Sequence, residues 1–272
     1  IAQRRRGIFK GWSLVLIILT FNLVLFGAFI TRSGVISSPH AFARSAIGFS
    51  FLAAFAVALF LPLRLLLHRW EQIKSRPVES LLSREGAFLA ANVLLLGATF
   101  AVLLGTFTLG ITRANSSSWN RMMGPVFLAS IVLMGMCALL RWRPGAPRRL
   151  ARSLAGPSGV AAMAGLGLLL LGVRQWVALV ALSLCVAALA AILLAWGREV
   201  GRRRRASGEL LPLAFFSLLW SNRPRYGGYI VHISIIVMAV GIIGSSFFKA
   251  EVKGDLMPGQ TLALNGYTLI YQ

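Results

Sequence analysis

Acidic residues are scarce in this sequence, which has 7 Asp and Glu against 28 Lys and Arg among 272 residues. The paired carboxylates that a hydrolase or a proton-coupled transporter uses are therefore largely absent. Cysteine is also rare. Cys137 and Cys185 both lie within apolar runs and form no CxxC motif, so we expect them to be small core residues. Histidine occurs at three positions, His40, His68 and His232.

Apolar residues, by contrast, are abundant. Hydrophobic residues make up 57% of the chain and charged residues 13%, with a mean hydropathy of +0.77. A soluble domain of this length cannot bury so much apolar surface, which predicts a polytopic membrane protein. The net charge of +21 raises nucleic-acid binding as an alternative. Because the basic residues form short runs between apolar spans, we expect no nucleic-acid partner.

Seven apolar stretches are long enough, at about 1.5 Å per residue, to cross a hydrocarbon core of about 30 Å as helices. The apolar stretch Leu210 to Trp220 is too short to span and is expected to lie in the interface. The fold class is therefore an all-α polytopic membrane protein with about seven transmembrane helices. The predicted spans are 12–30, 46–67, 85–107, 124–140, 154–173, 176–196 and 229–248.

After residue 248 the pattern changes to strand-like alternation with the turn signals Met257-Pro258-Gly259 and Asn265-Gly266. We expect two domains: a transmembrane helical domain over 1–248 and, over 249–272, the start of a small β-rich domain. Because the chain begins at Ile1 and ends at Gln272 in mid-pattern, we expect it to be a piece of a longer protein.

Basic residues are distributed unevenly between the two sides of the membrane. Of the 28 Lys and Arg, 21 lie in 1–11, 64–84, 141–152 and 197–225, and 7 lie in the loops of the other side. The positive-inside rule places the richer side in the cytoplasm. The His40 loop and the C-terminal tail are then outside, which is the periplasm for the inner (plasma) membrane of a bacterium. We expect the run 202–205 to fix this topology and to touch anionic membrane lipid.

Glycines occur in groups within the later spans. Such groups are typical of helices that approach each other closely, and we expect this role here and no cofactor binding. The glycines concerned are Gly165, Gly167, Gly172, Gly241 and Gly244.

His232 lies inside the last span, where a polar side chain is costly unless it is paired or ligated. Two interpretations are open. It is an axial ligand to a buried haem, or it is a core histidine hydrogen-bonded to a neighbouring helix. Gly228 and Ala239 on its face leave room for a planar partner, but the residues alone favour the second interpretation.

His40 lies in the polar island TRSGVISSPHAFA, residues 31–43, between two apolar runs. Pro39 stiffens the approach to it. A neutral imidazole here is either a ligand for a metal or haem iron arriving from water, or an exposed loop histidine. Arg32 and Arg44 either pair with haem propionates or anionic lipid, or are interfacial charges. His68, beside Arg69 at a membrane end, is assigned no site.

Three motifs in order, read together, are more specific than any one histidine. They are the polar island 31–43, the stretch NRPRYGGYIVH at 222–232 with a following GSS, and Ser83-Arg84-Glu85 with Asn92 and Leu104 to Thr106. Together they resemble the CcmF family of cytochrome c-type biogenesis proteins, the large membrane component of the bacterial haem lyase. The resemblance runs from about residue 11 to residue 260 and favours the haem interpretations.

The resemblance implies an enzyme, a cytochrome c haem lyase component that helps attach haem to the CxxCH motifs of apocytochromes c at the periplasmic face. His40 would be the catalytic residue and, with Arg32, would bind incoming haem brought by the chaperone CcmE, its imidazole ligating the iron transiently. His232 would ligate the iron of a buried haem b together with a histidine outside this chain. CcmH and CcmI would be further subunits.

The sequence departs from the family in several places. The tryptophan-rich WWD segment and the second histidine of each ligand pair are absent from this sequence, and Pro39 and Pro224 stand where the family usually has other residues. Two alternatives from other classes stay open: a transporter or channel for a small molecule, and a structural scaffold of a membrane assembly complex. Haem content distinguishes the first interpretation from both.

Overall fold

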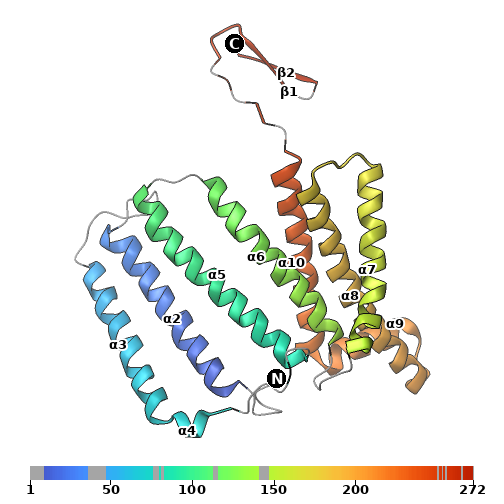
Figure 1. The fold of residues 1–272 in the computed structure, drawn as a ribbon, viewed down its shortest axis with the longest axis horizontal. Helices are drawn as coiled ribbons and strands as arrows, with labels where there is room; N and C mark the ends of the chain where they lie inside the picture. The colour runs from blue at the N-terminus through green and yellow to red at the C-terminus, as the bar shows by residue number, and fades with distance from the viewer. Residues whose placement is uncertain are drawn as a thin grey trace. The chain divides into compact units, whose positions relative to one another are not determined.

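The structure of the chain is a computed structural model that describes residues 9–35, 47–75, 80, 83–112, 116–140, 147–249, 251–252, 254, 256–264 and 266–271. Long helices dominate it (Figure 1). In chain order the helices are α2 Lys10–Ser33, α3 Ile47–His68, α4 Trp70–Ile73, α5 Arg84–Thr112, α6 Ser116–Leu139, α7 Pro147–Leu170, α8 Trp176–Ser207, α9 Leu211–Ser221 and α10 Arg223–Phe247.

Seven of these helices are long and apolar enough to cross a membrane, namely α2, α3, α5, α6, α7, α8 and α10. A small two-stranded sheet follows them at the C-terminus. The predicted fold class, a polytopic α-helical membrane protein with a small β-rich part, is therefore confirmed.

The C-terminal sheet is an antiparallel hairpin of β1 Thr261–Leu264 and β2 Tyr267–Ile270. Leu264 pairs with Tyr267 at the end of the ladder next to the turn. Gly266, directly before Tyr267, has a φ of 85°, which a glycine adopts without steric cost. The Asn-Gly pair at this place in the sequence is the strongest short-range signal for such a turn.

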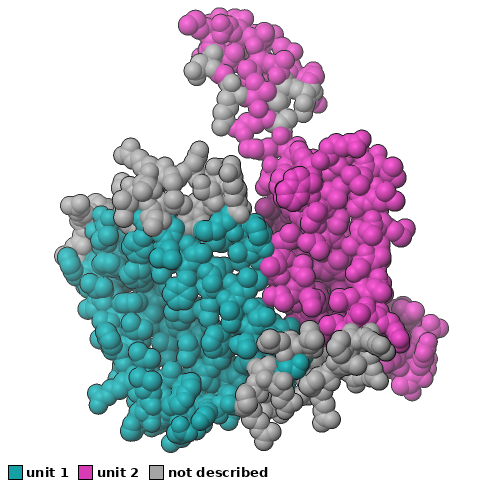
Figure 2. Space-filling model, viewed as in Figure 1, with its two compact units in different colours: residues 1–127, 142–144 teal, residues 128–141, 145–272 magenta. Residues whose placement is uncertain are grey.

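The chain divides into two compact units, shown in different colours in Figure 2. Unit 1 comprises residues 1–127 and 142–144, and unit 2 comprises residues 128–141 and 145–272. Each unit is described by itself below.

In unit 1, α2 and α3 pack as an antiparallel pair. A Cβ at Gly48 would lie 2.8 Å from the Cα of Ser33, so the start of α3 touches the end of α2 where no larger residue fits. Phe26 packs against Phe55 and Phe107, with ring centroids 5.5 and 5.9 Å apart. The contact of Phe26 with Phe55 joins α2 to α3, and the contact with Phe107 joins α2 to α5. The helices α2 and α3 flank residues 36–46, the segment that carries His40 and that lies outside the described residues.

A buried asparagine completes the hydrogen bonding of this helix pair. Pro62 lies inside α3 and has no N–H, so the carbonyl of Ala58, four residues earlier, lacks its helical donor. Asn22 of α2 is 2% exposed, and its Nδ2 donates to the Ala58 carbonyl at 3.0 Å and to the Ile18 carbonyl at 2.8 Å. The side chain therefore replaces the donor that the proline removed.

In unit 2, α8 packs its small residues against neighbouring helices. Ala178, Ala181, Cys185 and Ala188 are all at most 7% exposed. A Cβ at Gly135 of α6 would lie 2.8 Å from the Cα of Ala188, so these two helices are in near backbone contact. Cys137 and Cys185 are both buried in this unit, and neither forms a disulfide among the described residues.

The predicted roles of the grouped glycines are only partly correct. A Cβ at Gly165 would meet Ser183 Oγ at 2.9 Å, so this glycine does permit a close approach of α7 to α8. Gly172 has a φ of 90° and serves the turn between them. Added Cβ atoms at Gly167, Gly241 and Gly244 would meet nothing within 4 Å among the described residues. The prediction of close helix contact there is wrong for the described part of the chain, because helical spacing alone does not say which face meets a neighbour.

We predict that Asn22→Leu lowers the free energy of unfolding by about 1–3 kcal/mol, because it leaves the Ala58 carbonyl buried without a donor. The added change Pro62→Ala restores the backbone N–H and should recover most of this loss, which a double-mutant cycle in detergent measures. Thr20→Val on the same helix removes an exposed side-chain bond to the Leu16 carbonyl and should change stability little. Simple additivity of Asn22→Leu and Pro62→Ala would contradict this account.

Candidate functional site

The helix that carries His232 begins with a proline in its first turn. Pro224 is the second residue of α10, where its missing N–H has no helical partner to lose and its fixed φ suits the helix. The amides of Arg225 and Tyr226 donate to the Asn222 carbonyl at 3.0 and 3.2 Å. Arg223 lies over the Trp220 ring, 4.4 Å from its centroid, and links this start to α9. The departure at Pro224 is thus structurally tolerated.

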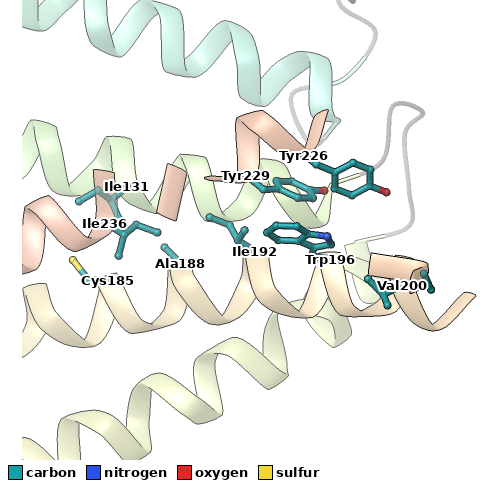
Figure 3. Close-up of a cluster of buried hydrophobic side chains, with 10 residues drawn as sticks. Ile131, Cys185, Ala188, Ile192, Trp196, Val200, Tyr226, Tyr229 and Ile236 are labelled. Atoms are coloured by element: carbon teal, nitrogen blue, oxygen red, sulfur yellow. The ribbon is translucent and has the colours of Figure 1, made fainter. Parts of the chain in front are cut away.

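One face of α10 is packed into the core of unit 2. Tyr226 and Tyr229 are each 3% exposed, and Ile236 is 1% exposed. They contact α8, where Ile192 is fully buried (Figure 3). His232 lies one turn before Ile236 on the edge of this face, half-buried and with Nδ1 inside the protein.

Open space lies next to His232 along the helix. Among the described residues, a Cβ added at Gly228, one turn before the histidine, would meet nothing within 4 Å, and the same holds at Gly227. Ile235, on the outer side, is 37% exposed. Within the described part of unit 2, the helix face at these glycines is therefore open, which fits a planar ligand lying against it.

A carboxylate that the sequence analysis missed holds the start of α10. Glu199 of α8 accepts hydrogen bonds from Tyr226 Oη at 2.7 Å and from Arg225 Nη2, and Arg202 Nη2 lies 3.8 Å away. The Glu199 side chain is 12% exposed and that of Arg225 is 37% exposed. The sequence signal was an acid, one turn after Trp196, in a connector that is mostly basic.

Aromatic rings close the same region. The Trp196 ring stacks on Phe215 of α9 with centroids 4.9 Å apart and planes at 20°. The Tyr226 and Tyr229 rings each lie 5.9 Å from Trp196. Buried aromatic pairs of this kind contribute about 0.5–1.5 kcal/mol beyond their burial. Together with Glu199 they fix the rotation of α10 and so the direction in which His232 faces.

The other predicted site residues lie elsewhere in the chain. Arg32 is exposed in the last turn of α2, within unit 1. His40 and Arg44 lie outside the described residues. His68, to which no site was assigned, is the exposed last residue of α3. Arg32 and His232 belong to separate units.

Comparison with known proteins gives several long matches. The chain is 31% identical to the cytochrome c-type biogenesis protein CcmF of Pseudomonas fluorescens and 29% identical to that of Escherichia coli, over 98% of this chain in both cases. It is 27% identical, over its full length, to the cytochrome c-type biogenesis protein NrfE of Haemophilus influenzae. No family model matches the chain, and no solved structure matches it.

The fold and these matches define a polytopic α-helical membrane protein whose relatives carry the name cytochrome c-type biogenesis protein. The chain is a homologue of the CcmF, CycK and NrfE proteins, which confirms the resemblance found in its motifs. It spans about two fifths of their length, 41% for the CcmF of Pseudomonas fluorescens.

We predict that Glu199→Gln lowers the free energy of unfolding by about 1.5–3 kcal/mol, because it weakens hydrogen bonds to a charged group in a largely buried place. Glu71→Gln is the matched control. The Glu71 side chain is 83% exposed and lies 4.0 Å from Lys74, and its loss should change stability by at most about 0.5 kcal/mol.

Thermal unfolding in detergent, followed by a thiol-reactive dye, measures both variants because Cys137 and Cys185 are buried until the helices separate. Equal melting temperatures of Glu199→Gln and the wild type would show that the carboxylate does not hold α10 in place.

Proposed function

We propose that this chain is part of a haem-binding membrane component of cytochrome c maturation, a cytochrome c haem lyase. The observation that carries the proposal is His232, half-buried beside the open volume at Gly228, in a chain homologous over 98% of its length to CcmF. A histidine within a membrane span has to be paired or ligated, and axial ligation of iron is one way to meet this requirement.

His232 would hold one axial position of a buried haem b, and a histidine outside this sequence would hold the other. Bound haem would supply the iron that changes oxidation state and, at the second site, the vinyl groups that the substrate thiols attack. The chain's own residues then have three tasks. Tyr226, Tyr229 and Glu199 orient α10, the His232 imidazole binds iron, and the Gly228 face admits a flat macrocycle.

The second site would lie in the connection between α2 and α3. His40 would ligate incoming haem, and Arg32, exposed at the end of α2, would pair with a propionate. The tight contact of Gly48 with Ser33 keeps the two ends of this connection close together.

The location and the partners follow from the same proposal. The seven spans would lie in the bacterial inner membrane, with the His40 loop and the β-hairpin on the periplasmic side because the opposite loops carry most of the arginines. The haem chaperone CcmE, the subunits CcmH and CcmI and apocytochrome c would meet the protein there.

The first test is the reduced-minus-oxidised visible spectrum of the natural protein purified in detergent, compared with His232→Ala. We expect a low-spin b-type signal that His232→Ala removes and that the control His68→Ala retains. A stable wild type without haem would support the transporter or scaffold alternative instead. A signal unchanged in His232→Ala would show that His232 is not a ligand.

A separate test addresses the second site. His40→Ala should lower the yield of holocytochrome c in cells at least tenfold, by loss of the iron ligand, while the buried haem signal stays at its wild-type level. Ser37→Ala, in the same segment, is the matched control and should support normal maturation. Normal maturation in His40→Ala would remove His40 from the mechanism, and joint loss of both signals would show that the two sites are not separate.

A further inference from the structure

A groove of about 780 Å³ lies between the C-terminal part of α8 and the folded-back helix α9. Two glycines line it, and a Cβ added at either would meet nothing within 4 Å among the described residues. The rest of its lining is apolar except at one end, where two arginines line it. Its lining includes Gly197, Gly201, Arg204, Arg205, Leu211 and Phe215.

The groove exists because α8 ends at a glycine. Gly208 has a φ of 66°, and its amide donates to the Arg204 carbonyl at 2.9 Å, which closes the helix. The chain then reverses, and α9 folds back until Phe215 stacks on Trp196. Leu213 and Phe216 of α9 face away from this packing and are 60% and 66% exposed.

The position of the groove along α8 matches a membrane interface. The 32 residues of α8 extend about 48 Å, well beyond a hydrocarbon core of about 30 Å. If Trp176 lies at one interface, Trp196 lies about 30 Å further along, at the other. The groove begins beside Trp196 and ends at Arg205, so it leads from the hydrocarbon into the headgroup region.

The charges around the groove leave two arginines for a ligand. Among the described residues, Glu199 is engaged by Arg225, Tyr226 and Arg202. Glu209 is engaged by Arg203, whose hydrogen bond holds the pKa of that carboxyl below its ordinary value. No acidic side chain of the described part of the chain lines the groove. The exposed Arg204 and Arg205 lie on the same face of α8 as the two glycines.

We propose that this groove is a binding site for an anionic phospholipid. The acyl chains lie against Gly197, Gly201 and the apolar side of α9, and the phosphate accepts hydrogen bonds from Arg204 and Arg205. The ligand class follows from the combination of an apolar groove, a place at the interface and a pair of guanidinium groups, which bind phosphate oxygens in a forked geometry. The site is independent of His232 and of haem.

Native mass spectrometry of the natural protein in detergent tests the site, with phosphatidylglycerol titrated against phosphatidylcholine of the same acyl chains. We expect phosphatidylglycerol to bind more tightly. An arginine near an anionic headgroup adds a factor of about five in affinity, so Arg204→Gln with Arg205→Gln should weaken binding about thirtyfold. The matched control Arg198→Gln with Arg202→Gln removes the same charge from the adjacent face of α8 and should stay within about twofold of the wild type.

Two further variants separate the headgroup from the groove. Gly201→Leu fills open volume and should weaken both lipids alike. Arg204→Lys with Arg205→Lys keeps the charge and should retain the preference for phosphatidylglycerol, even if the glutamine pair fails to fold. Equal losses of binding in Arg204→Gln with Arg205→Gln and in Arg198→Gln with Arg202→Gln would overturn the proposal, because binding would then depend on the total positive charge of this region and not on the groove. Unchanged binding in Gly201→Leu, or a wild type that retains a neutral molecule and no phospholipid, would overturn it as well.

Discussion

A backbone inside the hydrocarbon core finds no water, so every N–H and C=O there must be satisfied by the protein itself. This constraint explains why the apolar runs of this chain are helices. It also explains what happens where a helical hydrogen bond is missing. Pro62 removes one donor from α3, and the Asn22 side chain of α2 replaces it at the Ala58 carbonyl. A polar residue within an apolar span is thus the counterpart of a proline in the neighbouring span, and together they fix the register of the two helices.

Unit 2 also has few polar contacts between its helices. The small residues of α8 allow α6 to approach to near backbone contact at Gly135. The polar and aromatic contacts of α8 lie toward its C-terminal end. There Glu199 accepts from Tyr226 and Arg225, and Trp196 packs between the aromatic rings of α9 and α10. These contacts determine the rotation of α10 about its axis. The direction of His232 is therefore a consequence of residues one and two turns away from it.

Sequence patterns predicted the elements of this fold better than their contacts. Span length and hydropathy are properties of one segment, and so is the turn signal Asn-Gly in the sequence, which explains why the fold class was correct. Which faces meet is a property of two segments. Among the described residues, the close contacts therefore occur at Gly48, Gly135 and Gly165 and not at Gly241 or Gly244. Glu199 was missed for the same reason, because its partners come from another helix.

The contact between Glu199 and Arg225 also bears on the transporter alternative. An ion pair that joins two spans is what a proton-coupled transporter would use for gating, provided that the pair can open and exchange partners. Glu199 here has further partners in Tyr226 and Arg202, and Tyr226 is itself buried against Trp196. Opening the pair would therefore also break the hydrogen bond from Tyr226 to Glu199 and disturb the contact of Tyr226 with Trp196. A cluster held in this way resists movement, which suits the proposed role of α10, to present His232 to a haem in a constant direction.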